Sequence, residues 1–324
     1  MMQSRLRAGD RVSVRSPAEI LATLDENGAL EGVPFMPEML GSCGRPFRIL
    51  RRVEKICVAD HPWRRFVQDD VVMLDDSRCD GQSHDGCKHG CRVLWKEAWL
   101  RAFEHMGEPD SMPAPDFGAT LEALRARLKV KADENHYFCQ STELLKATES
   151  FSGEKRGWMF RIALRAIRGG DLSALRVLRL FALWSWQTLM QKLGRGQCPS
   201  GPHRRTPTQS LGLKPGESVR VKSRAQIAET LDQRGRNRGM HIGYEMMRCC
   251  GKQAEVRYRV DRIIDERTGI MLELADTVAL QNMRPQALVE ECLCGGQLGD
   301  CPRGELMYWR EIWLERVGHD QVER

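Results

Sequence analysis

Residues 9–16 read GDRVSVRS and residues 216–223 read GESVRVKS, so one pattern recurs 207 positions later. Near the end of each copy the offset becomes 214, where WKEAWL at residues 95–100 meets WREIWL at residues 309–314. Many identities at two nearly constant offsets indicate that one module occurs twice in the chain. This repeat limits the fold to two similar halves with a different segment between them.

Both halves are predicted to be rich in β-structure. Val12 and Val14 alternate with polar residues, which is the pattern of a half-buried strand. Several short apolar runs separated by turn residues follow, as is typical of a small barrel or rolled sheet. We therefore expect an α+β protein with two homologous small β-barrel (SH3-like) modules, at residues 1–108 and 207–324. A helical segment at residues 109–206 is expected to join them.

The joining segment contains the most apolar stretch of the chain. Leucines from Leu121 to Leu128 recur at helical spacing, and residues 172–193 are predicted to form a long apolar helix. Two placements fit this helix: burial between the modules, or binding to a membrane surface through Trp184 and Trp186. Apolar residues occur nearly all the way round the helix, so burial is favoured.

Charge and cysteine content limit which cellular compartment and which partners are expected for the protein. The chain has 50 Lys and Arg against 44 Asp and Glu, a formal charge of +6. Basic and acidic residues are interleaved, without the dense basic face usual in nucleic-acid-binding proteins, so nucleic acid is not an expected partner. The first ten residues are not followed by an apolar run, so no export signal is expected. Twelve cysteines then favour a reducing cytoplasm, where clustered cysteines bind metals more often than they form disulfides.

Cys79, Cys87 and Cys91 form the densest group of candidate metal ligands. Several glycines separate them and allow the backbone to fold tightly around a small centre. Thiolates are soft ligands suited to zinc or to an iron–sulfur cluster. A structural zinc ion needs four ligands, so a fourth residue is required.

Three residues compete for the fourth position. Cys43 is preferred because its counterpart in the second copy, Cys250, is also a cysteine. Cys57 is a rival whose counterpart is Ile264, and His84 can also complete the shell.

The second copy offers three thiols for an equivalent site: Cys250, Cys294 and Cys301. Glu305 replaces Cys91 there, so the set is incomplete. Either Cys249 or Cys292 substitutes, or a carboxylate does, or this copy holds no metal.

Two further patterns allow both a functional and a structural interpretation. Glu97 and Glu311 follow the last cysteine of each copy and either lie beside a metal centre or belong to a cap whose tryptophans pack in the core. The structural interpretation is favoured, because paired aromatic residues are usually buried. Cys139 and His136 either form a nucleophile and its base, or Cys139 is structural or an additional ligand.

The sequence also resembles a known group of proteins. The resemblance rests on the runs at residues 78–100, 139–144 and 301–314, including RCDG, CQSTEL and YWREIWL. These runs are specific and resemble a bacterial family with two cysteine-rich repeat modules. The family has no established activity, so the resemblance implies no function. It does imply that the segment around Cys139 belongs to the family pattern.

The expected function is that of a cytoplasmic metal-binding scaffold or accessory protein, with zinc or an iron–sulfur cluster. Its paired modules would bind a protein partner or a small molecule. This expectation draws on the use of other small paired barrels, which is an analogy of fold. The alternative is a metal- or iron–sulfur-dependent enzyme of a bacterial biosynthetic pathway.

Overall fold

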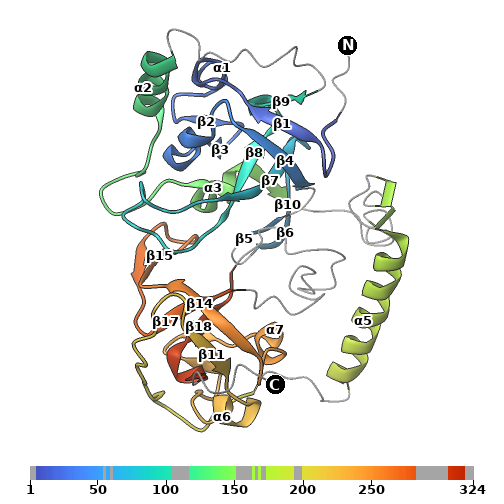
Figure 1. The fold of residues 1–324 in the computed structure, drawn as a ribbon, viewed down its shortest axis with the longest axis vertical. Coiled ribbons are helices and arrows are strands. Elements are labelled where there is room, and N and C mark those ends of the chain that lie inside the picture. The colour runs from blue at the N-terminus through green and yellow to red at the C-terminus, as the bar shows by residue number, and fades with distance from the viewer. Residues whose placement is uncertain are drawn as a thin grey trace. The chain divides into compact units, whose positions relative to one another are not determined.

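The computed structural model describes residues 5–53, 56–58, 61–103, 117–150, 163–164, 167–168, 173–192, 199–281 and 306–317. These residues form a mixed α/β structure with mostly sheets and few helices (Figure 1). The chain divides into two compact units. Unit 1 comprises Met1–Ala174, Ile264–Leu272 and Pro302–Gly304, and unit 2 comprises Leu175–Ile263, Glu273–Cys301 and Glu305–Arg324.

Unit 1 is built on a five-stranded sheet with the order β8-β7-β4-β1-β9. Its strands are β1 (Arg11–Val14), β4 (Pro46–Arg52), β7 (Val71–Arg78), β8 (Arg92–Lys96) and β9 (Leu100–Ala102). The two edge strands, β8 and β9, are joined only by the 3₁₀ helix η2 (Glu97–Trp99). Because so short a link connects opposite edges, the sheet must curl.

Unit 2 contains a five-stranded sheet with the corresponding order, β18-β17-β14-β11-β19. Its strands are β11 (Ser218–Val221), β14 (Gln253–Arg259), β17 (Thr277–Leu280), β18 (Tyr308–Arg310) and β19 (Leu314–Arg316). The 3₁₀ helix η4 (Glu311–Trp313) again joins the two edge strands. The prediction that both copies share one strand order is confirmed.

The pairing registers of the two sheets also correspond. Val12 lies opposite Ala102, and Val219 lies opposite Arg316. These pairs differ by the same 207 and 214 positions that relate the copies in the sequence. Since a slip of one residue would turn every side chain to the other face, the apolar pattern of each copy fixes this register.

A short helix follows the first strand of each sheet. These helices are α1 (Pro17–Leu21) and α6 (Arg224–Ala228). Ser16 and Ser223 cap them, each in a capping box completed by Glu19 or Gln226. Reciprocal bonds of this kind satisfy backbone N–H groups that a helix leaves free at its start, which explains why both copies bend there.

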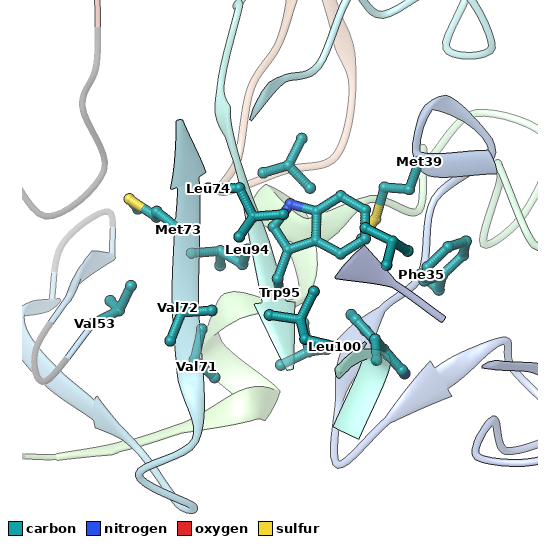
Figure 2. Close-up of a cluster of buried hydrophobic side chains, with 14 of the residues drawn as sticks. Phe35, Met39, Val53, Val71, Val72, Met73, Leu74, Leu94, Trp95 and Leu100 are labelled. Carbon is teal, nitrogen blue, oxygen red and sulfur yellow. The ribbon is translucent and has the colours of Figure 1, made fainter. Parts of the chain in front are cut away.

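Trp95 lies within the core of unit 1 (Figure 2), and Trp99 belongs to the same buried cluster. Trp95 and Trp99 are fully buried, and the Phe35 ring meets them edge-on at centroid distances of 6.1 and 5.2 Å. Trp95 lies on β8 and Trp99 in η2, and both pack in the core as the structural interpretation of this motif predicts. A strand followed by one tight turn brings both side chains to the same side.

The segment expected to join the modules contributes to unit 1. Its first helices are α2 (Phe117–Arg127) and α3 (Gln140–Ala147). Leu124, Leu144 and Ala147 from these helices belong to the same buried cluster as Trp95. A separate three-stranded sheet, β10-β6-β5, is formed by β5 (Ile56–Val58), β6 (His61–Phe66) and β10 (Thr148–Ser150).

The long apolar helix is present as α5 (Ala174–Lys192). The prediction that this helix is buried is wrong. Leu175, Leu178 and Trp186 are 82, 70 and 61% exposed, and Val177 is the one buried residue among its described side chains. Among the helices that the structure describes, none has the length and apolar character needed to cross a bilayer.

Candidate metal centre

The cysteine-rich segment forms a tight loop between β7 and β8. The amide of Cys79 donates to the carbonyl of Cys91 at 2.8 Å, which closes the loop. Inside it, the amides of His84 and Gly86 both donate to the carbonyl of Gly81 at 3.0 Å. Gly81 has a φ of +68°, a backbone conformation that favours glycine. The glycines of this segment therefore serve to fold the loop back on itself.

Cys139 reaches this loop from a different part of the chain. It precedes α3 as the N-cap residue, and Ser141 in the first turn of α3 places its hydroxyl 3.3 Å from the Cys91 thiol. The thiols of Cys79 and Cys139 interact electrostatically with each other and with Cys91, and Cys87 interacts with Cys91. Four thiols from two distant stretches of sequence therefore gather in unit 1.

Three of these thiols, those of Cys79, Cys87 and Cys139, are held in their protonated form. Burial raises the pKa of Cys139 to about 12, and the nearby Cys91 thiol contributes to the same shift. Burial also raises the pKa of Cys79 and Cys87, and the Glu38 carboxylate and the Cys91 thiol add to both effects. Four neighbouring thiolates would repel one another, so only a bound cation can stabilise the deprotonated cluster.

A buried histidine–carboxylate pair lies beside the thiols. His84 Nδ1 is 2.6 Å from Glu38 Oε1, and His84 Nε2 is 3.1 Å from the carbonyl oxygen of Phe138. A carbonyl only accepts hydrogen bonds, so Nε2 carries a proton. Burial opposes a charge on His84, but Glu38 raises its pKa above the usual value. Both ring nitrogens are engaged, so His84 positions Glu38 and the segment before Cys139 and does not serve as a metal ligand.

Glu38 retains one unused acceptor. Its side chain is 3% exposed, and Oε2 is buried without a hydrogen-bond partner in the part of the chain that the structure describes. Sequence reasoning did not select Glu38 as a site residue, although its match with Glu245 in the second copy was a signal. An unpaired buried carboxylate oxygen is costly and requires a physical reason. A cation held by the thiols would supply one.

Cys87 is covered by a hairpin from a later part of the chain. The hairpin consists of β15 (Arg262–Ile264) and β16 (Met271–Glu273). The Ile264 amide donates to Cys87 Sγ at 3.4 Å, and the Tyr137 amide donates to the Gly269 carbonyl at 2.8 Å. Ile264, Tyr137 and Cys87 form a small buried cluster within unit 1. These contacts shield Cys87 from water.

The structure does not join Cys43 to the other predicted ligands. Cys43 is 8% exposed, lies in the hydrophobic core after the 3₁₀ helix η1 (Pro37–Ser42), and has no interaction with another cysteine in the described residues. The thiol that interacts with Cys79 and Cys91 is instead that of Cys139, which proximity in space and not the repeat brings to the loop. The side chain of Cys57 lies outside the described residues.

The second predicted set is only partly visible. Cys250 is half-buried and interacts with the adjacent Cys249, whereas Cys294 and Cys301 lie outside the described residues. Across the residues that are described, no group of three or more His, Cys, Asp or Glu side chains is arranged to hold a metal ion. Coordination by the gathered thiols would therefore require their side chains to move.

The two glutamates after the last cysteines are structural anchors. Glu97 Oε1 accepts from the Leu6 amide at 3.2 Å and pairs with Arg52. Glu311 accepts from Gly212 and Leu213 at 2.9 and 3.2 Å. Each glutamate therefore fixes the segment that leads into the first strand of its sheet, in agreement with the structural interpretation of this motif.

Gln140 has a structural role that the sequence did not reveal. Its side-chain amide accepts from the Leu94 amide and donates to the Leu94 carbonyl, both at 2.8 Å, and also donates to the Pro34 carbonyl at 2.9 Å. It thereby satisfies the open edge of β8 as another strand would. Because Gln140 follows Cys139 directly, these bonds fix the position of the fourth thiol.

Cys139 and His136 do not form a catalytic pair. His136 is partly exposed, and its Nδ1 lies 2.7 Å from Asp133 Oδ1. The pKa of Cys139 is raised by burial, which is opposite to what an activated nucleophile needs. This arrangement favours the structural or ligand role of Cys139.

Each copy hydrogen-bonds its second tryptophan to a threonine, which permits a matched test. Trp99 Nε1 donates to Thr23 Oγ1 and Trp313 Nε1 donates to Thr230 Oγ1, both at 3.0 Å. Replacing either threonine with valine leaves a buried indole N–H unpaired and is expected to cost about 1–3 kcal/mol of unfolding free energy. Local hydrogen exchange measures the cost. Clearly unequal losses in Thr23→Val and Thr230→Val would show that the two copies are not equivalent in energy.

Comparisons of the chain with protein-family models, curated proteins and solved structures found no match.

Proposed function

We propose that Cys79, Cys87, Cys91 and Cys139 bind zinc or an iron–sulfur cluster, and that the protein is a tandem-module metal-binding scaffold. The observation that carries this proposal is the convergence of Cys139 with the cysteine loop. Four thiolates complete the shell of a structural zinc ion or of a cluster. Zinc and iron–sulfur chemistry share this ligand set, so the metal itself is left to measurement.

Charge supports a bound cation over a group of inert thiols. Buried cysteines can pack as small apolar residues, and this is the competing interpretation. Such packing leaves Glu38 Oε2 without a partner and places a carboxylate beside Cys79 and Cys87 with no benefit. A cation in the cluster would compensate both the thiolates and this carboxylate.

The proposal also includes an interpretation of the two sheets. The two curled sheets are interpreted as duplicated SH3-like barrels, each with its last two strands joined by a 3₁₀ turn. A scaffold is favoured over an enzyme because the polar residues near the thiols are committed to structure. His84 uses both ring nitrogens in hydrogen bonds to Glu38 and to the Phe138 carbonyl. A metal in the second copy, through Cys250, Cys294 and Cys301, is an extension of the proposal.

Elemental analysis and absorption spectroscopy of anaerobically purified protein test the site. We expect at least one equivalent of zinc, or iron with visible thiolate–iron bands, in the wild-type protein. Cys139→Ser should lose about tenfold or more in metal content or in affinity against a chelator, because one strong ligand is removed. Since metal displaces thiol protons, affinity should also fall as the pH is lowered.

Cys43→Ser is the matched control, because this thiol is also buried but lies apart from the cluster. It should retain the wild-type metal content. Metal-free wild-type protein, or equal loss in Cys43→Ser and Cys139→Ser, would overturn the assignment.

A further inference from the structure

The helix α5 is labelled in Figure 1. One of its faces carries an exposed apolar stripe. Leu175, Leu178, Ala182, Trp186 and Leu189 are all exposed, the four large side chains among them by 82, 70, 61 and 48%. Their spacing of three or four residues places them on one face of a helix. Water-exposed apolar side chains that form a continuous stripe mark an interaction surface, unlike single exposed residues.

In the sequence, the positive charge of the protein is concentrated in and next to this helix. Residues 155–196 contain nine Lys and Arg and one Asp, a formal charge of +8. The rest of the chain has 41 basic and 43 acidic residues, a formal charge of −2. Residues 174–192 contain no acidic residue, and helical geometry places Arg176 and Arg179 beside the stripe. Basic and acidic residues are therefore not interleaved in this part of the chain, although the sequence as a whole led us to expect it.

The combination of apolar stripe and basic border selects the kind of partner. A second copy of α5 would bring like charges together, which opposes self-association. A nucleic acid would pair with the arginines but would leave the leucines and the tryptophan in water. An anionic lipid surface accommodates both, because apolar side chains enter the headgroup boundary while arginines remain at the phosphates.

We propose that α5 is an interfacial helix that binds the protein to anionic membranes through Leu175, Leu178, Trp186 and Leu189. The helix lies on the bilayer and does not span it, in keeping with the charges at Arg176 and Arg179. This membrane site is independent of the thiol cluster, and loss of either leaves the other in place.

Co-sedimentation of the full chain with vesicles tests the proposal. Vesicles of equal parts phosphatidylglycerol and phosphatidylcholine should bind the protein about tenfold or more strongly than vesicles of phosphatidylcholine alone, because each arginine near an anionic surface adds to the attraction. High salt should weaken this binding, because it screens the attraction between the arginines and the lipid headgroups. The double variant Leu178→Ser, Trp186→Ser should lose about tenfold or more in partitioning, since two large apolar side chains no longer enter the lipid.

The control is Val67→Ser with Leu272→Ser, which removes two exposed apolar residues elsewhere, 58 and 42% exposed. This variant should bind vesicles like the wild type, and circular dichroism and metal content should match in all three proteins. If the stripe variant does not fold, Arg176→Gln with Arg179→Gln serves in its place and should weaken binding to the anionic vesicles. Equal binding of the stripe and control variants, or no preference for anionic vesicles, would overturn the proposal. A dimer or a DNA complex that depends on the stripe while vesicles do not bind would also overturn it.

Discussion

Replacing Gly81 with alanine is expected to disrupt the cysteine loop and abolish metal binding. A Cβ atom at this position would lie 2.0 Å from the Cys87 carbonyl oxygen and 2.8 Å from the carbonyl carbon. These are backbone atoms, so no side-chain movement relieves the clash. Cys87 must shift instead, and the amides of His84 and Gly86 then lose their shared acceptor at Gly81.

The expected loss of unfolding free energy in Gly81→Ala is several times the loss caused by an unfavourable φ alone. Gly44→Ala is the control, because Gly44 has a φ of +76° and a Cβ atom added there would meet nothing within 4 Å beyond its chain neighbours. It should cost about 1–2 kcal/mol, the usual penalty for a left-handed residue with a side chain. Gly81→Ala should exceed this and also lose metal. Hydrogen exchange over residues 79–91 and metal stoichiometry measure both effects, and equal results for the two variants would contradict the structure.

Glu311→Gln is expected to be the most destabilising single change in unit 2. The Glu311 side chain is fully buried, receives the Arg259 guanidinium at 2.5 Å and accepts the backbone amides of Gly212 and Leu213. Glutamine has one acceptor oxygen and presents an NH₂ group to these donors. Arg259 is 40% exposed and can be solvated by water, so the cost comes from the buried backbone amides left without an acceptor, about 1–3 kcal/mol for each.

Glu97→Gln provides the matched comparison in unit 1. The carboxylate of Glu97 pairs with Arg52, but the Glu97 side chain is 25% exposed. Glu97 accepts a hydrogen bond from the Leu6 amide, whereas Glu311 accepts hydrogen bonds from several backbone amides. Water can reach the Glu97 side chain, and Arg52, although only 7% exposed, keeps the Leu6 carbonyl as an acceptor, so a smaller effect of about 1–3 kcal/mol is expected. Hydrogen exchange at residues 211–221 and at residues 5–14 reports the two losses separately. A Glu97→Gln loss as large as that of Glu311→Gln would contradict the role of burial.

Local sequence determined the repeated parts of the fold. Alternating valines specify a strand with one buried face, so Val12 and Val219 lie at equivalent register positions. Ser16 with Glu19 and Ser223 with Gln226 specify helix starts through bonds that span only three residues. Interactions of this range are written in consecutive residues, and they could be predicted from either copy.

Only the tertiary structure decided which thiols meet. The repeat favoured Cys43, but packing buried it in the core, and Gln140 brought Cys139 to the loop by bonding to the backbone of β8. Such a contact joins residues 46 positions apart and leaves no local periodicity in the sequence. The match of Glu38 with Glu245 marked a shared position but not its role, because the environment of Glu38 is created by His84 and the cysteine loop.

The exposure of α5 was also a tertiary outcome. An apolar helix has the same sequence pattern whether it is enclosed by protein or faces a lipid surface, because both environments remove apolar side chains from water. The sequence predicted the helix at residues 172–193 nearly to its ends. Burial of a helix depends on what packs against it, which no local pattern specifies, and the exposed Leu175, Leu178 and Trp186 became apparent only in the folded chain.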